Sequence, residues 1–232
     1  MFLKTLLNDT LHLFYPHVCI GCGSDLVQHG NLICLKCSSI LPQTNFAQYA
    51  NNPIEKIFWG RIALVAAHSE FYFSKESLIQ QLIHLLKYKN NKEIGFYMGE
   101  IMGKSLLNSN RFNTIDALIP LPLNAAKERK RGYNQAAIIC EGMSAVMQIP
   151  VIKNNVLRQR YTDTQTKKHR TERWQNVADS FVIKYAASLK GRHLLLVDDV
   201  VTTGATLEAC GDIILSLEGV KLSIATLAQA PK

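Results

Sequence analysis

Short apolar runs and longer amphipathic stretches follow one another along the chain from about residue 60 onward. Runs of consecutive apolar residues predict buried strands, which we place over residues 62–68, 116–123, 193–200 and 221–228. Apolar residues spaced three and four apart predict helices over residues 75–88, 93–107, 134–147 and 205–217. Shorter elements are expected as strands at 156–160 and 181–184 and as a helix at 171–181. Apolar strands that alternate with helices are typical of a parallel sheet covered on both faces, so we predict an α/β fold.

The chain before this region has a different pattern. Residues 2–14 carry leucine and phenylalanine at helical spacing, and four cysteines follow within residues 19–37. Residues 41–54 are uncharged and rich in turn-forming residues, which is typical of a linker. We therefore predict two parts: an N-terminal helix with a cysteine module over residues 1–45, and the α/β domain over residues 60–232.

The cysteine module has the spacing of a metal site. Its cysteines form two C-x2-C pairs, which are Cys19 with Cys22 and Cys34 with Cys37. In a chain without an export signal, such pairs indicate a bound metal rather than disulfides, and four thiolates suit a structural tetrahedral Zn2+. Unliganded thiols, or iron in place of zinc, are the alternatives. Cys140 and Cys210 lie in apolar helical stretches, where we expect them to pack as small hydrophobic side chains.

Composition and charge narrow the class of protein. The 232 residues are 47% hydrophobic, which excludes a disordered chain, and no apolar run reaches the about 18 residues of a membrane-spanning helix. Asn8, Asp9 and His12 interrupt the apolar core that a signal peptide needs, so we expect a cytoplasmic protein without membrane insertion. The net charge is +8, and residues 127–173 hold most of it, with eleven Lys and Arg against four Asp and Glu.

The segment LLLVDDVVTTGATL carries the strongest chemical signal. Asp198 and Asp199 end a buried strand, and a loop rich in threonine opens the next helix. Ligands of open α/β sheets bind beyond the carboxyl ends of the strands, and the free N–H groups at a helix start bind phosphate. We predict that the two carboxylates bind the hydroxyl groups of a ribose and that the loop binds its 5′-phosphate. The loop residues are Val200, Val201, Thr202, Thr203, Gly204, Ala205 and Thr206.

This segment resembles the signature of type I phosphoribosyltransferases, which bind 5-phosphoribosyl-1-pyrophosphate (PRPP). Receiver domains and phosphatases also place aspartates after a strand, but they do so early in the fold, whereas only 33 residues follow Asp199. The sequence has no Walker P-loop of the form G-x4-G-K-[ST].

Two basic segments precede the aspartates. The first, NAAKERKRGYNQA, is predicted as a loop after the strand at 116–123, and its charge suits the pyrophosphate of a magnesium-bound ligand. Its basic side chains are Lys127, Arg129, Lys130 and Arg131. The second segment spans residues 156–181. Tyr133, Tyr161 and Trp174 are interleaved with these charges, so the surface suits a single-stranded nucleic acid, although the aromatic side chains can equally be packing residues.

The whole arrangement resembles the ComF family, which is also called the GntX family. The matching pieces are the four-cysteine finger, PLPLNAAKERKRGYNQA, LRQRYTDTQTKKHRTERWQNVADSF and LLLVDDVVTTGAT, in that order. The resemblance implies a type I phosphoribosyltransferase fold with a small N-terminal zinc finger, and a role in natural competence. In that role the protein handles incoming single-stranded DNA, with competence-machinery proteins as further partners.

The resemblance also implies roles for individual residues. Asp198 and Asp199 would contact the ribose hydroxyls, directly or through Mg2+, residues 202–206 would hold the 5′-phosphate, and residues 129–134 would lie at the pyrophosphate loop. Two classes of function stay open. One is an enzyme that transfers phosphoribosyl from PRPP to an acceptor with release of pyrophosphate, and the other is a protein that binds PRPP and DNA without catalysis. A zinc-finger docking protein with a vestigial sugar site is a third.

Overall fold

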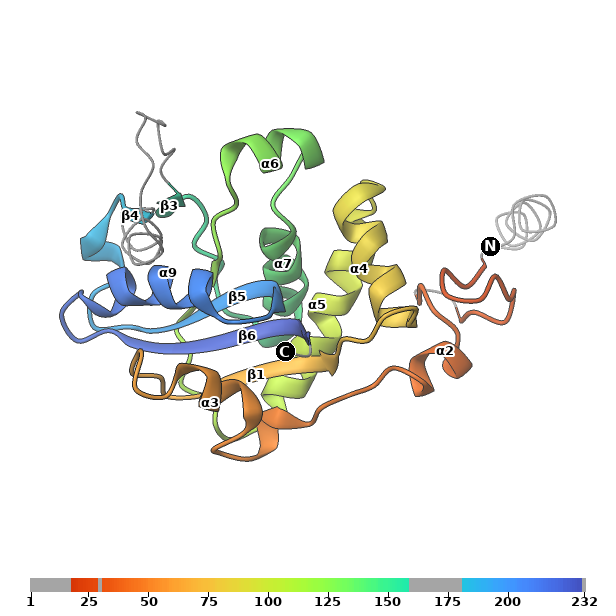
Figure 1. Ribbon diagram of the computed structural model, residues 1–232, viewed down its shortest axis with the longest axis horizontal. Helices are drawn as coiled ribbons and strands as arrows, with labels where there is room; N and C mark the ends of the chain where they lie inside the picture. The colour runs from red at the N-terminus through yellow and green to blue at the C-terminus, as the bar shows by residue number, and fades with distance from the viewer. Residues whose placement is uncertain (1–17, 29–30, 159–180, 231–232) are drawn as a thin grey trace, which may run out of the picture.

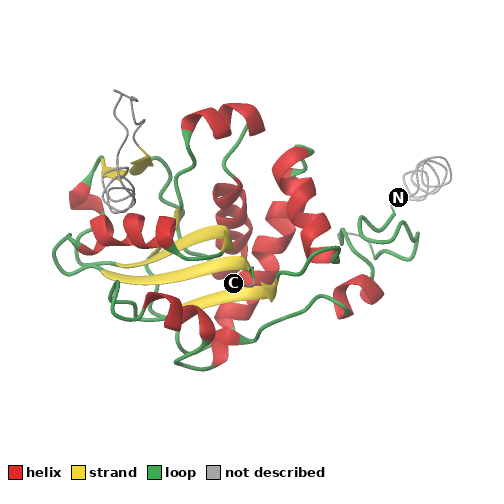
Figure 2. Cartoon of the chain, viewed as in Figure 1, coloured by secondary structure: helices red, strands yellow, loops and turns green. Residues whose placement is uncertain are grey.

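A four-stranded parallel sheet forms the centre of the molecule (Figure 1). The computed structural model describes residues 18–28, 31–158 and 181–230. The strand order is β1-β6-β5-β2, and the strands are Ala67–Tyr72, Lys221–Gln229, His193–Val201 and Ala117–Pro120. Helices cover both faces of the sheet, as Figure 2 shows, so the predicted α/β fold is confirmed. The helices predicted over 2–14 and 171–181 lie outside the described residues, except for Phe181, which begins a strand.

Two hydrophobic cores lie on opposite faces of the sheet. The first lies between the sheet and three helices. They are α4 (Leu78–Tyr88), α5 (Lys92–Leu107) and α7 (Gln135–Met147). Side chains such as Leu82, Met98 and Ile139 pack there against Leu195 and Val197 of β5. The helices α5 and α7 approach each other so closely that a Cβ atom on Gly142 would lie 2.0 Å from the carbonyl oxygen of Phe96. Glycine is required at that crossing.

The second core lies on the opposite face, under α9 (Ala205–Leu215) and α3 (Pro53–Phe58). The sequence predicted a linker over residues 41–54, and this prediction is wrong. Phe46 in the short helix η1 (Phe46–Gln48) and Ile54 in α3 are at most 1% exposed. The buried Asn52 donates hydrogen bonds to the carbonyl oxygens of Phe46, Tyr49 and Ala67. The segment is therefore part of the α/β domain and packs beside its edge strand β1.

Smaller elements complete the described chain, and several differ from the sequence prediction. The helix α2 (Leu35–Ser39) belongs to the cysteine module, and a short helix η2 spans Ala186–Ser188. The strands β3 (Val156–Arg158) and β4 (Phe181–Ile183) form an antiparallel pair. The first sheet strand begins at Ala67 rather than residue 62, and α4 begins after Ser77, whose side chain caps the helix. No helix in the described part of the chain combines the length and apolar character needed to cross a lipid bilayer.

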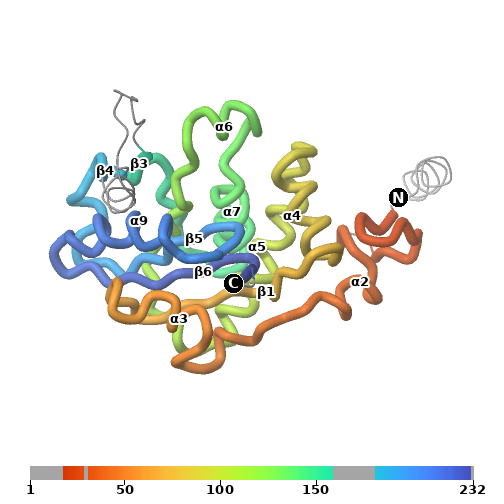
Figure 3. Tube along the Cα trace, in the orientation of Figure 1, coloured from red at the N-terminus to blue at the C-terminus, as the bar shows by residue number. Residues whose placement is uncertain are grey.

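The segment after β2 is a helix and not the predicted loop. The helix α6 (Ala125–Arg131) begins where the Asn124 side chain accepts a hydrogen bond from the backbone N–H of Ala126. It ends at Gly132, which adopts the left-handed conformation with φ of 79°. Both residues are typical helix caps, and the residues between them are good helix formers. Figure 3 shows α6 standing above the carboxyl end of the sheet, opposite the end of α4.

Candidate functional site

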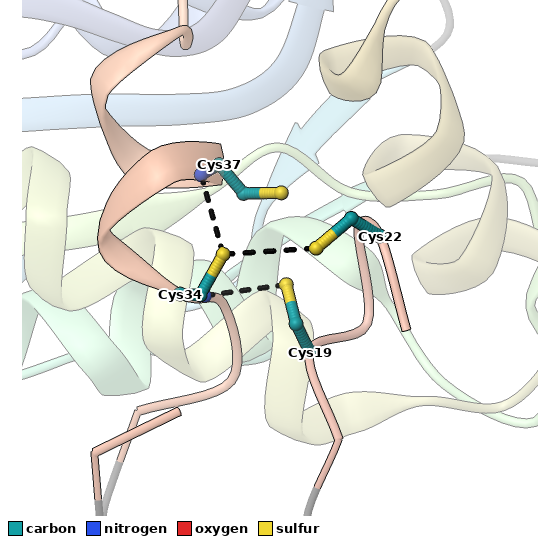
Figure 4. Close-up of side chains that lie close together, drawn as sticks. All are labelled: Cys19, Cys22, Cys34 and Cys37. Atoms are coloured by element: carbon teal, nitrogen blue, oxygen red, sulfur yellow. Dashed lines mark hydrogen bonds between the residues drawn. The ribbon is translucent and has the colours of Figure 1, made fainter. Parts of the chain in front are cut away.

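The four cysteines of the finger converge on one point (Figure 4). Their Sγ atoms lie within 4.8 Å of one another, and Cys22 and Cys34 are separated by 3.7 Å between sulfurs. With a Zn–S bond of about 2.3 Å, the edge of a ZnS4 tetrahedron is about 3.8 Å. The structure contains no disulfide among these cysteines. The donor set and its spacing therefore fit a four-thiolate zinc centre.

Backbone geometry at each C-x2-C pair directs N–H groups toward the sulfurs. The backbone N–H of Cys34 donates to the Cys19 sulfur at 3.2 Å, and that of Cys37 donates to the Cys34 sulfur at 3.5 Å. Burial opposes ionisation of Cys19. The hydrogen bonds that its sulfur accepts from the backbone N–H groups of Cys34, Cys22 and Gly21 outweigh this effect and lower the pKa of Cys19 to about 6. Burial and the neighbouring sulfurs raise the pKa of Cys37. One cysteine of the cluster thus ionises easily, whereas several thiolates together need a bound cation to stabilise their charge.

The finger packs against the α/β domain through α4. Cys19, Ile33 and Cys37 belong to the same buried cluster as Ile79 and Leu82 of that helix. A Cβ atom on Gly21 would lie 2.8 Å from the Leu78 side chain, so the finger backbone approaches the start of α4 closely. The cysteine cluster therefore lies against the start of the helix whose other end reaches Asp199.

Asp198 and Asp199 lie near the carboxyl end of β5, within the strand and not after it. Successive residues of a strand point to opposite faces of the sheet. Asp199 accordingly shares a face with Val197 and pairs with Lys87 of α4, with 2.8 Å between Nζ and Oδ1. Asp198 shares the other face with Leu196 and lies on the side of α9. The structure thus gives the two carboxylates separate surroundings, which the sequence did not show.

The surroundings of Asp198 oppose ionisation of its carboxyl group. Removal from water is the largest effect on Asp198, and the charge of Asp199 adds to it, so that the pKa of Asp198 rises to about 8. The backbone N–H of Asp199 donates to Oδ1 of Asp198 at 2.8 Å and offsets part of this rise. A bound cation would lower the pKa again, because it favours the charged form. The pair is therefore a suitable place for Mg2+ or for hydroxyl groups.

Lys87 is a functional candidate that sequence reasoning missed. It lies in the last turn of α4, far in sequence from Asp199, and it looks like an ordinary solvent-facing residue of an amphipathic helix. The fold brings it to a cleft of about 390 Å3 between α4 and α6. The cleft is lined by Lys87, Tyr88, Asn90, Lys127, Lys130 and Arg131. Of the four basic residues predicted in the first basic segment, the fold therefore brings all but Arg129 to this cleft.

The threonine-rich loop leads into the N-terminus of α9, as predicted, but Val200 and Val201 belong to the end of β5 and not to the loop. Thr202 and Thr203 are exposed, and Gly204 begins α9 with φ of 76°. The first backbone N–H groups of an α-helix have no partner within the helix, so they point outward at this loop. Together with the hydroxyl group of Thr206, they can hold a phosphate.

The loop is held from behind by residues 57–61, which follow the predicted linker in sequence. The guanidinium group of Arg61 donates to the carbonyl oxygens of Thr203 and Ile57, at 2.9 Å and 3.0 Å, and pairs with Glu208 of α9. A Cβ atom on Gly204 would lie 2.8 Å from both Ile57 and Phe58 of α3. The only sequence signal for these contacts is an arginine just before the predicted first strand, which is too weak to interpret.

Tyr133, one of the three aromatic residues predicted for base stacking, is not placed for that role. Tyr133 is only 7% exposed, and its hydroxyl group donates to the carbonyl oxygen of Leu86. It is therefore a packing residue, which was the other alternative. Tyr161 and Trp174 lie outside the described residues. Cys140 and Cys210 are fully buried, as expected for packing residues.

Comparison with known proteins agrees with this geometry. Residues 124–232 match the family described as "Phosphoribosyl transferase domain". Competence protein F of Haemophilus influenzae is 26% identical over 228 residues, which cover 96% of this chain and 95% of that protein. DNA utilization protein YhgH of Escherichia coli K12 is 26% identical over 219 residues, covering 88% and 92%. Competence protein ComFC of Bacillus subtilis is 26% identical over 195 residues, covering 82% and 74%.

The match to Competence protein F covers 96% of this chain, so it spans both the cysteine module and the α/β domain. The fold is that of a type I phosphoribosyltransferase, with a four-cysteine cluster near its N-terminus. The chain is therefore a homologue of the proteins named Competence protein F, ComFC and DNA utilization protein YhgH, and it carries a phosphoribosyl transferase domain.

Proposed function

We propose that this chain is a ComF-like cytoplasmic protein of DNA uptake that binds PRPP with Mg2+ and also binds single-stranded DNA. One observation carries the PRPP part. The carboxylates of Asp198 and Asp199, the threonine-rich start of α9 and a cationic cleft meet at one edge of the sheet. PRPP presents a diol, a terminal phosphate and a diphosphate, and each of these groups has a chemically matching partner there.

In this proposal, each group of residues has one task. Asp198 and Asp199 hold the ribose hydroxyls, directly or through Mg2+, which supplies positive charge for the diphosphate. The N–H groups and hydroxyls of residues 202–206 hold the 5′-phosphate. Lys130 and Arg131 bind the diphosphate, and Lys87 leaves Asp199 to join them. Four thiolates of the finger bind structural Zn2+, and the finger is available for competence-machinery proteins.

Phosphoribosyl transfer is a second candidate, which a second cavity favours. A space of about 460 Å3 opens beside the end of β2 and is lined by Pro122, Tyr133, Asn134, Lys153 and Arg158 among others. An acceptor in it would form a bond to C1′ of PRPP while the bond from C1′ to the diphosphate oxygen breaks. The diphosphate would leave with both electrons of that bond, and the cleft cations would stabilise its charge.

Calorimetric titration with PRPP and Mg2+ tests the sugar site. The Asp199→Asn variant keeps the size of the side chain but removes its charge, so we expect its PRPP affinity to fall at least about 30-fold, the range for a lost charged contact. Asp212→Asn, on the exposed side of α9, is the matched control and should bind as the wild type does. Equal binding by Asp199→Asn and the control would place the sugar site elsewhere.

Fluorescence anisotropy with a labelled oligo(dT) at several salt concentrations tests the DNA part. Alanine at Arg129, Lys130 and Arg131 together should weaken binding and reduce the salt slope, because fewer counterions are released. The matched control removes three exposed cations remote from the cleft, and these are Lys184, Lys190 and Arg192. An unchanged slope in the first triple variant would place the DNA surface elsewhere on the protein.

A further inference from the structure

The cleft between α4 and α6 has the composition of a binding site for two different polyanions. Resting on the proposed function, we propose that single-stranded DNA and the diphosphate of PRPP compete for this cleft, and that Tyr88 is the residue on which a DNA base stacks. The sequence motifs of the sugar site do not include Tyr88, and the sequence favoured other aromatic residues for this role.

The cleft concentrates positive charge from two helices that are distant in sequence. Its lining contains Lys87 from the end of α4 and Lys127, Lys130 and Arg131 from α6, and no carboxylate is among its described lining residues. A volume of about 390 Å3 has room for a diphosphate or for a nucleotide unit of a strand. Four cations around one opening favour a ligand with several negative charges over a single carboxylate.

Tyr88 supplies the feature that a diphosphate does not need. Its side chain is 59% exposed, although it stands at the lip of a cleft lined by charged groups. The guanidinium carbon of Arg131 lies 5.5 Å from the centre of its ring, and the His84 ring lies 4.9 Å away. These contacts orient the ring while most of its surface stays open. An exposed aromatic ring beside a cationic groove is the usual platform for an unpaired base.

This arrangement selects for a single strand. In a duplex, each base is already stacked and paired, and the ring of Tyr88 has no base face to contact. In a single strand, phosphates can lie along the cations of α6 while one base turns onto Tyr88. Stacking is tolerant of base identity, so we expect little sequence preference, as suits a protein that handles incoming DNA of any sequence.

Competition follows from the position of Lys87. Its Nζ atom lies 2.8 Å from Oδ1 of Asp199, so the cleft begins where the ribose site ends. A ribose held at Asp199 would extend its C1′ diphosphate into the cleft, toward the cations that DNA phosphates require. The same ammonium and guanidinium groups cannot serve both ligands at full strength, and the antagonism must be equal in both directions.

The first test measures binding of a fluorescein-labelled 20-nucleotide oligo(dT) by anisotropy. Tyr88→Ala should weaken binding about tenfold, and Tyr88→Phe should stay within about twofold of the wild type, because phenylalanine keeps the ring. The matched control is Tyr185→Ala, since Tyr185 is 60% exposed and has Lys184 at 5.2 Å from its ring but is not in the cleft. Equal effects of Tyr88→Ala and Tyr185→Ala would overturn the stacking role.

The second test measures competition at constant ionic strength and Mg2+. PRPP at ten times its own dissociation constant should raise the apparent Kd of the oligonucleotide about elevenfold. Ribose 5-phosphate, which lacks the diphosphate, should leave it within about twofold. An unchanged Kd with PRPP, or an equal effect of both sugars, would overturn the shared cleft. A wild-type protein that bound PRPP but no DNA would instead contradict the DNA part of the proposed function, so the two failures can be told apart.

Discussion

Replacing Asp198 by asparagine should stabilise the ligand-free protein at alkaline pH. The carboxylate of Asp198 is partly buried and lies beside Asp199, and desolvation and this neighbouring charge raise its pKa from 3.8 to about 8. Asparagine has nearly the same shape, and its side-chain oxygen can still accept the hydrogen bond from the backbone N–H of Asp199. The substitution therefore removes the unfavourable charge and retains the local hydrogen bond.

The pKa rise fixes the size and the sign of the effect. At about 1.36 kcal/mol per pH unit, a rise from 3.8 to about 8 corresponds to on the order of 5 kcal/mol. Because the pKa of Asp198 is higher in the folded state, its contribution to stability is fully present below about pH 4 and is lost as the pH rises to about 8. The gain in Asp198→Asn should thus be near zero at pH 4 and largest above pH 8.

Urea unfolding at pH 5 and pH 8.5, without Mg2+ or PRPP, measures this difference. We expect the free energy of unfolding of Asp198→Asn to exceed that of the wild type by about 2–5 kcal/mol at pH 8.5 and by clearly less at pH 5. Asp25→Asn, at an exposed site of the finger, is the control and should change it by no more than about 0.5 kcal/mol. A gain that is the same at both pH values, or a loss at pH 8.5, would refute the electrostatic reasoning.

Three further predictions concern the supports of the site. Gly204→Ala should lower the free energy of unfolding by about 1–3 kcal/mol, because φ is 76° and the new Cβ atom meets Ile57 and Phe58 at 2.8 Å; an unchanged urea midpoint would contradict this. Asn52→Ala should cost about 2–4 kcal/mol in the same assay, since the carbonyl oxygens of Phe46, Tyr49 and Ala67 lose their donor, and a loss below about 1 kcal/mol would disagree. Cys19→Ser should remove one bound zinc per chain by elemental analysis while the far-UV circular dichroism of the α/β domain persists, and retained zinc would count against the four-thiolate centre.

Local patterns in the sequence were sufficient to predict the position of most helices and strands of the α/β domain. The strand at 193–200 and the helices at 93–107 and 134–147 agree with the structure to within a residue or two, because continuous apolar runs and amphipathic spacing survive tertiary packing. The strand at 62–68 was misplaced, because the structure pairs the polar but buried stretch from His68 to Glu70 as β1. Burial of polar residues depends on partners that lie elsewhere in the chain.

The residues of the candidate site could be predicted from the sequence wherever they are neighbours in the sequence. The cysteine pairs, the two aspartates and the threonine-rich loop are contiguous motifs, so the sequence alone was enough to predict a cluster of four cysteines and a set of polar side chains at a strand end. Only the tertiary structure decided that α4 brings Lys87 and Tyr88 to α6, and that residues 57–61 hold the threonine-rich loop. The physical reason is that a motif records short-range geometry, whereas contacts between distant segments arise from packing of the two cores and leave no local pattern.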